Sequence, residues 1–264
     1  MAKTAEKTDV AVLNQGGVPA ALVDRMKADS GKGVSMSSED SIIPMIYLLQ
    51  ANSPQVKSRD PKYIEGARDG DIWMRNSVKR EVVSGDEGFL FQPCYFSKAW
   101  IEWKPQRGGF VARHDERPGD AVLQQITTDT GDTRPAWVRP NGNIVQDVRE
   151  HFGFADDQPY MISFSSTGHT VSREWMTKQK QFTIPGTRDV APAWSRKYKF
   201  KTTSRSNARG QSWSQFKIED AGWVETAEEY ERGQALYESL ERGEKRGEDY
   251  AAPEVVAVDD KIPF

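Results

Sequence analysis

The amino-acid sequence predicts a mainly β fold with few helices. The chain of 264 residues contains 21 Gly and 14 Pro, many of them near its middle, and this composition favours short strands and turns over long helices. From residue 78 onward, runs of aromatic and β-branched residues alternate with turn residues. With 37% hydrophobic and 28% charged residues, we expect an economical core and a polar surface.

Changes in composition divide the chain into four parts. Residues 1–40 are rich in Ala, Lys, Gly and Ser and are expected to form a flexible leader, with a short helix over 19–28. Residues 41–224 carry the strand signals and form the main domain. A Glu-, Ala- and Leu-rich segment, 225–246, predicts a C-terminal helix with a narrow apolar stripe. Residues 247–264 are expected to be a disordered acidic tail.

Within the main domain, most expected elements are strands. The segments are 42–50 (strand or short helix), 63–73 (two strands around a Gly-rich turn), 79–83, 89–104, 110–113, 160–166, 194–203 and 211–218. A turn over 105–109 would pair the strands beside it, whereas 114–150 is expected to form long loops or a hairpin that includes Trp137. The best helix runs from Thr170, as its N-cap, to Lys180.

Several classes of protein are excluded by what the sequence lacks. The single cysteine, Cys94, excludes an internal disulfide and a cysteine-rich zinc site. No apolar run is long enough to span a membrane, and the N-terminus lacks the apolar region of a signal peptide. The sequence contains neither a Walker nor a Gly-x-Ser-x-Gly motif. We therefore expect a cytoplasmic protein that is not an enzyme and needs no cofactor.

The net charge of −3 conceals two segments of opposite charge. Residues 160–217 hold eleven Lys and Arg but only two acidic residues, whereas residues 218–264 hold fourteen Asp and Glu against five Lys and Arg. A basic segment suits a polyanion, and an acidic tail can compete for the same surface. The overall pI therefore does not exclude a nucleic-acid partner.

Basic and aromatic residues are interleaved in two stretches of the main domain. As a strand, 197–201 would place Lys197, Lys199 and Lys201 on one face and Tyr198 and Phe200 on the other, where they can form core. Single-stranded DNA is bound by cationic grooves with aromatic side chains that stack on bases. The candidate DNA-binding residues are Lys98, Trp100, Trp103, Arg107, Phe110, Arg113, Trp194, Arg196, Lys197, Lys199, Lys201, Arg205, Arg209, Trp213 and Lys217.

The last six residues, Asp-Asp-Lys-Ile-Pro-Phe, carry two carboxylates ahead of an apolar end. This ending resembles the C-terminal tip of bacterial and phage single-stranded DNA-binding proteins, except that the family usually has an acidic residue in place of Lys261. The resemblance implies that the tip recruits replication and recombination proteins such as a polymerase, helicase, nuclease or recombinase. The tip residues concerned are Asp259, Asp260, Ile262, Pro263 and Phe264.

The same resemblance implies an OB-fold-like barrel with insertions, for which 114–150 is the candidate. It implies sequence-independent binding of single-stranded DNA in replication, recombination and repair, in the bacterial host cytoplasm if the protein is phage-encoded. Two alternatives stay open. One is a strand-annealing recombination mediator. The other is a metal-dependent nuclease: of the three histidines, His114, His151 and His169, the first two lie beside carboxylates in the segments 113–116 and 147–151, although neither segment matches a known ligand spacing.

Overall fold

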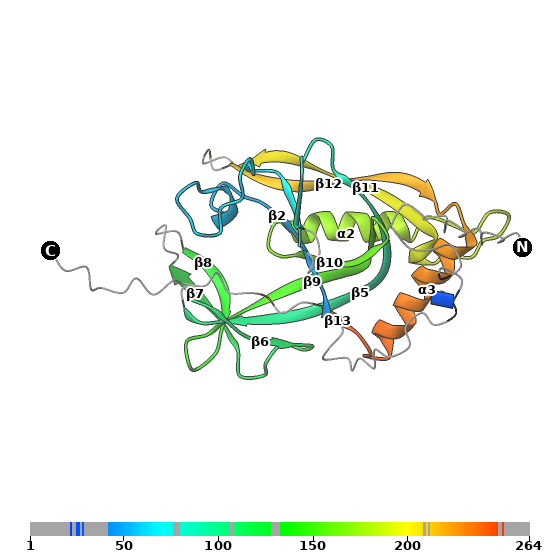
Figure 1. Ribbon diagram of the computed structural model, residues 1–264. Helices are drawn as coiled ribbons and strands as arrows, with labels where there is room; N and C mark the ends of the chain where they lie inside the picture. Colours follow the sequence, from blue (N-terminus) through cyan, green and yellow to red (C-terminus); the bar gives the residue numbers. More distant parts are fainter. Residues whose placement is uncertain are drawn as a thin grey trace, which may run out of the picture.

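The computed structural model describes a mainly β protein built around one large curled sheet (Figure 1). It describes residues 22, 25, 26, 28, 42–75, 80–105, 108–127, 133–207, 210, 212–247 and 250. The four described residues of the N-terminal segment, Leu22, Arg25, Met26 and Ala28, are helical, as expected for 19–28. The rest of that segment lies outside the described residues.

Strands account for most elements of the described chain. They are β1 (Ile42–Ile43), β2 (Met45–Leu48), β3 (Ile72–Arg75), β4 (Arg80–Val83), β5 (Phe89–Trp103), β6 (Phe110–His114), β7 (Val122–Thr127), β8 (Thr133–Val138), β9 (Ile144–Ala155), β10 (Gln158–Phe164), β11 (Arg196–Ser206), β12 (Ser212–Trp223) and β13 (Arg246–Gly247). The helices are α2 (Gly168–Gln179), α3 (Ala227–Glu241) and the short 3-10 turns η1 (Pro54–Val56) and η3 (Ala193–Ser195).

Eleven of these strands form a single sheet. Its main path runs β12-β11-β5-β9-β10-β2-β3-β4, with β6 on β5 and the β7–β8 hairpin on β9. Neighbouring strands are antiparallel except β10 and β2, which are parallel. The side chain of Gln50, just beyond β2, donates to the backbone carbonyl of Ser214 on β12 and accepts from its N–H. The sheet therefore curls back until β2 approaches its far edge, which confirms a barrel-like, mainly β architecture.

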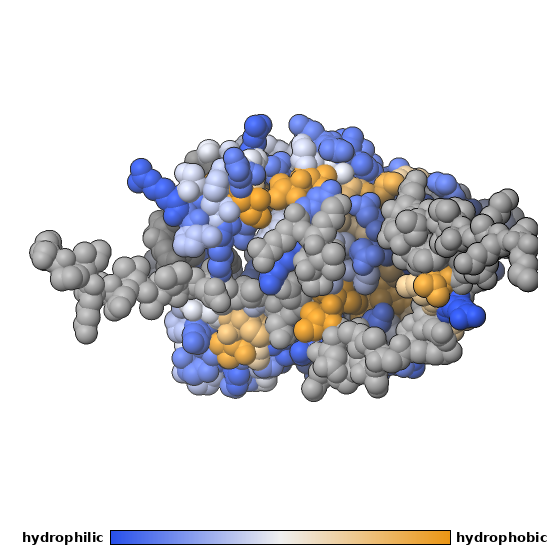
Figure 2. All heavy atoms as spheres, in the orientation of Figure 1, coloured by the Kyte–Doolittle hydropathy of each residue, from blue (hydrophilic) through white to orange (hydrophobic). Residues whose placement is uncertain are grey.

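The core is enclosed by this curl. Helix α2 lies inside it (Figure 1) and inserts Trp175, only 2% exposed, among Phe91, Tyr198 and Phe200. Helix α3 covers the opposite face through Leu236 and Leu240, which pack with a second cluster that includes Cys94, Phe152 and Met161. Cys94 is therefore a buried apolar residue. Around the core, hydrophilic residues surround separate apolar patches on the face shown in Figure 2.

Five sequence expectations need correction. Residues 144–150, expected in long loops or a hairpin, form the first part of the strand β9. The C-terminal helix, expected over 225–246, ends at Glu241. Residues 63–66 form turns rather than a strand, because Gly66 adopts a positive φ of 81° and the preceding segment is folded by local backbone hydrogen bonds. Helix α2 begins at Gly168, with Thr167 at its N-cap, so Thr170 lies inside the helix. Ordered contacts extend beyond the expected start of the tail at Gly247, because the Tyr250 hydroxyl lies 2.7 Å from Ser163 Oγ.

Candidate nucleic-acid interface

The β11–β12 hairpin carries the lysine-rich stretch predicted from the sequence. Tyr198 and Phe200 are buried in the core, so the alternation of a strand turns Lys199 and Lys201 to the outer face. On the same face, the register places Lys217 opposite Lys201 and Trp213 opposite Arg205. We call this outer face, made of Lys199, Lys201, Arg205, Trp213 and Lys217, the hairpin surface.

The hairpin surface is electropositive because it carries four cations, and within the described ranges only two of them, Lys201 and Lys217, lie near a carboxylate, that of Glu219. Glu219 accepts a hydrogen bond from Lys217 Nζ at 2.7 Å and lies 3.9 Å from Lys201 Nζ, and these lysines hold its pKa below the usual value. Lys199 Nζ donates to the backbone carbonyl of Gly88 rather than to an acid. Arg205 is exposed and has no acidic partner among the described residues. Alternate residues along a strand lie about 7 Å apart, so these side chains form an extended row of positive charge.

Two predicted DNA-binding residues of β11 serve the structure instead. Arg196 is only 6% exposed, and its guanidinium lies between the rings of Phe182 and Trp223 while donating to Asp220 at 2.6 and 3.2 Å. Lys197 is also occupied, because its Nζ lies 2.7 Å from Glu229 on α3. Neither cation is free for a phosphate. These pairs join residues 24 or more positions apart, so local sequence patterns did not reveal them.

Trp194 belongs to the interface between η3 and α3. Its ring lies 5.0 Å from that of Tyr237 and 6.1 Å from that of Tyr230. Gly233 of α3 permits this close approach, since a Cβ there would come within 2.6 Å of Trp194 Cβ. Trp194 is therefore a packing residue rather than a platform open to bases.

The β5–β6 hairpin forms as expected, but it does not gather its aromatic residues on one face. Trp103 packs against Phe110 and Tyr250 on the face of Ala99 and Ile101. Trp100 points to the other face, where its ring lies 6.4 Å from that of Trp137 in an edge-on arrangement. The hairpin residues are therefore divided between the two faces of the sheet, with Trp103, Phe110 and Arg113 on one face and Lys98 and Trp100 on the other.

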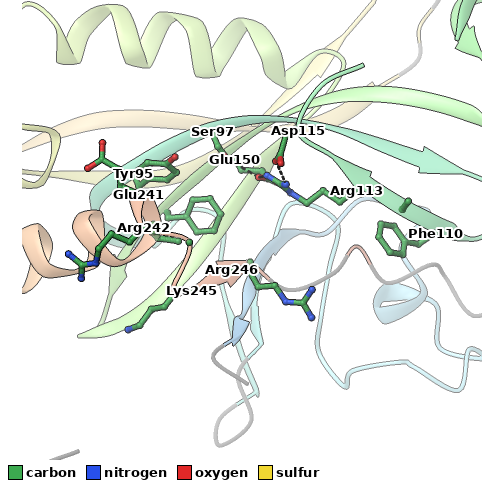
Figure 3. Close-up of a pocket in the computed structure, with 15 residues that line it drawn as sticks. Tyr95, Ser97, Phe110, Arg113, Asp115, Glu150, Glu241, Arg242, Lys245 and Arg246 are labelled. Atoms are coloured by element: carbon green, nitrogen blue, oxygen red, sulfur yellow. Dashed lines mark hydrogen bonds and ion pairs between the residues drawn. The ribbon is translucent and has the colours of Figure 1, made fainter. Parts of the chain in front are cut away.

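Arg113 neutralises a buried carboxylate at the edge of a cleft of about 660 Å³ (Figure 3). Its guanidinium donates to both carboxylate oxygens of Glu150, at 3.2 and 2.8 Å, and to Asp115 at 2.6 Å. Glu150 is 1% exposed and also accepts hydrogen bonds from Ser97 and Tyr250. Arg113 is thus needed to satisfy Glu150 and is not a free cation.

Sequence reasoning missed one cation–aromatic contact near Trp100. The exposed Arg117 guanidinium lies 3.8 Å from the centre of the Trp137 ring and 5.9 Å from that of Trp100. Arg117 has no carboxylate partner in the described part of the chain, and on the same side of β5 lie the exposed Lys98 and its cross-strand neighbour Arg149. Arg117 follows two acidic residues, Asp115 and Glu116, so the local charge pattern did not mark it as a binding residue. Only the basic and aromatic composition of the whole segment could have indicated this contact.

The two basic and aromatic regions occupy opposite ends of β5. β11 pairs with β5 at Phe89, whereas Trp100 lies eleven residues further along the strand, or about 36 Å of extended chain. A single ligand that reached both regions would have to be a long polymer. The predicted residues Arg107 and Arg209 and the tip residues 259–264 lie outside the described residues.

The three histidines lie in separate environments. His151 is fully buried, its Nε2 lies 2.8 Å from Ser172 Oγ, and burial lowers its pKa to about 3. His114 Nε2 lies 2.8 Å from Glu102, and His169 Nδ1 lies 3.6 Å from Asp147. Within the ranges that the structure describes, no group of three or more His, Cys, Asp or Glu residues is arranged to hold a metal ion.

Glu102 is the centre of a buried polar network beside His114. Burial alone would raise its pKa, but hydrogen bonds from Asn143, His114 and Arg139 lower the pKa to about 2. Arg139 in turn holds Asp120 at 2.9 Å. The network ties β5, β6 and the β8–β9 turn together, and both oxygens of the Glu102 carboxylate are engaged in hydrogen bonds.

The fold and its surfaces define a mainly β protein with a curled sheet, an internal helix and a cationic hairpin that carries a tryptophan. The chain belongs to the Pam3 phage gp34-like protein family, whose model matches residues 10–246. No curated protein and no solved structure matches the chain. Among the described helices, none combines the length and apolar character needed to cross a membrane.

Proposed function

We propose that this protein binds single-stranded DNA without marked sequence preference and protects it during phage DNA replication or recombination. The observation that carries the proposal is the hairpin surface, where four cations and Trp213 share one face of two strands. Single strands expose both phosphates and base faces, so a cationic row with an aromatic side chain satisfies both parts of the ligand. The barrel-like curl of the sheet is compatible with the OB-fold-like architecture expected from the sequence.

The acidic tip provides the second half of the proposal. Asp259 and Asp260 would steer the tail to a basic surface on a replication or recombination protein, and Ile262, Pro263 and Phe264 would fill an apolar pocket there. The resemblance of these residues to the tip of single-stranded DNA-binding proteins supports this assignment. The protein would act in the cytoplasm of the bacterial host.

Substitution of Trp213 tests the DNA-binding half directly. We expect Trp213→Ala to weaken oligo(dT) binding by at least about fivefold, since one stacked base contributes about 1–3 kcal/mol. Trp223→Ala is the matched control, because Trp223 is 39% exposed but stacks on Arg196. Fluorescence anisotropy of labelled oligo(dT) measures both variants, and equal affinities for Trp213→Ala and wild type would remove Trp213 from the interface.

A further inference from the structure

A second, smaller pocket lies where β8 separates from β9. β8 pairs with β9 only through Trp137↔Val145 and Val138↔Ile144, and its remaining residues pair with β7 alone. This divergence leaves a cavity of about 320 Å³ beside β9. The residues of its lining that matter here are Trp103, Leu123, Arg134, Trp137, Asp147 and His169.

Three of the residues that line this pocket each have a shielded side-chain nitrogen without a hydrogen-bond partner in the described part of the chain. Trp103 Nε1, Arg134 Nε and His169 Nε2 are shielded from solvent and have no hydrogen-bond partner among the described residues. Arg134 also has no carboxylate partner in those ranges. Buried donors are normally paired. Five other side-chain nitrogens of the described residues are also unpaired, so it is the position of these three residues in the lining of one pocket that favours a ligand supplying acceptors.

The shape and the walls of the pocket restrict that ligand further. Ligand pockets commonly begin at about 300 Å³ and combine aromatic walls with a few polar groups. Here the walls are Trp103 and Trp137, and the mouth includes Leu123, which is 59% exposed. The carboxylate of Asp147 adds one acceptor, held 3.6 Å from His169. A flat ring that presents a carbonyl oxygen beside an N–H group matches this arrangement of donors and acceptor.

We propose that the pocket between β8 and β9 accepts a single nucleobase that presents an oxo group beside a ring N–H, thymine, uracil or guanine, from a bound single strand. This inference rests on the proposed function and adds a modest base preference to it. Arginine is well suited to carbonyl and ring-nitrogen acceptors of bases. The β7–β8 hairpin that carries Arg134 is held to β9 at only two residue pairs, which allows the small opening that contact with the shielded nitrogen atoms requires.

Binding of oligo(dU) and oligo(dC) of equal length provides the test, because uracil has an oxo group at position 4 and a hydrogen on N3, whereas cytosine has an amino group at position 4 and an acceptor at N3. We expect the full-length protein to prefer oligo(dU) by about fivefold, the lower end of the discrimination given by one good arginine contact. Arg134→Gln should abolish the preference. Arg188→Gln, which removes an exposed arginine elsewhere, should retain it.

A second variant and a spectroscopic readout protect the test from a folding defect. Leu123→Glu places a negative charge at the exposed mouth and should weaken oligo(dU) binding more than oligo(dC) binding. In NMR spectra, the indole N–H signal of Trp103 should shift on addition of oligo(dU) in wild type but not in Arg134→Gln. Equal affinity of wild type for both oligonucleotides, or the same preference in Arg134→Gln as in Arg188→Gln, would overturn this inference alone. Failure to bind either oligonucleotide would overturn the proposed function with it.

Discussion

Removing two lysines from the hairpin surface has a calculable effect on the salt dependence of DNA binding. Each phosphate contact on a single strand contributes about 0.7 to the slope of log K against log salt concentration. If Lys199 and Lys201 each contact one phosphate, Lys199→Ala with Lys201→Ala should reduce the magnitude of the slope by about 1.4. Over a fourfold rise in salt, the wild type should therefore lose about sevenfold more affinity than the variant.

Fluorescence anisotropy of labelled oligo(dT) at several salt concentrations measures this slope. Lys178→Ala with Lys180→Ala is the matched control, since both residues are exposed at the end of α2 and carry the same charge. Glu219→Gln should act in the opposite direction, because it releases Lys217 and Lys201 from their shared carboxylate. A slope for the Lys199 and Lys201 variant equal to that of wild type would refute the assignment of these lysines to the DNA path.

Three further predictions concern stability and the tail. Arg196→Ala should lower the free energy of unfolding by about 2 kcal/mol in urea titrations, because it removes charged hydrogen bonds and two ring contacts. A change in the salt dependence of DNA binding by this variant would contradict the structural role of Arg196. The pKa of Glu102 is lowered in the folded state, so the ionised carboxylate stabilises the fold fully above pH about 4.5, and this stabilisation is lost as the pH falls toward 2. In urea unfolding midpoints measured against pH, Glu102→Gln should lose less stability than wild type over this range. A pH profile of Glu102→Gln equal to that of wild type would refute the network. Deletion of 259–264 should abolish capture of a partner enzyme by the immobilised protein and leave oligo(dT) affinity equal or slightly higher, whereas a clear fall in affinity would exclude the proposed role of the tip.

Local alternation allowed much of the sheet to be predicted from the sequence. The period of two in 197–201 correctly separated the buried Tyr198 and Phe200 from the outward lysines, because in a strand this separation depends only on neighbouring residues. The long strand β5 and the presence of helix α3 also followed from local patterns, although α3 ends at Glu241 rather than at residue 246. The curl of the sheet did not, since it depends on contacts such as that between Gln50 and Ser214.

The candidate site was less predictable, because the availability of a cation depends on partners distant in the sequence. Arg196 and Arg113 looked like Lys199 and Lys201 in the sequence, yet distant acids neutralise the two arginines. Arg134 showed the reverse: it was not selected from the sequence, and its lack of a partner among the described residues becomes visible only when β8 is placed beside β9. Charge pattern therefore located the hairpin surface but could not separate free cations from paired ones.

Titration of the intrinsic tryptophan fluorescence with unlabelled oligo(dT) and with matched duplex, at two salt concentrations, tests the central claim most directly. If the protein binds single strands, oligo(dT) should quench the fluorescence strongly, duplex should change it little, and the affinity for oligo(dT) should be lower at the higher salt concentration. Absence of quenching together with absence of binding to either DNA would contradict the claim that this protein binds single strands.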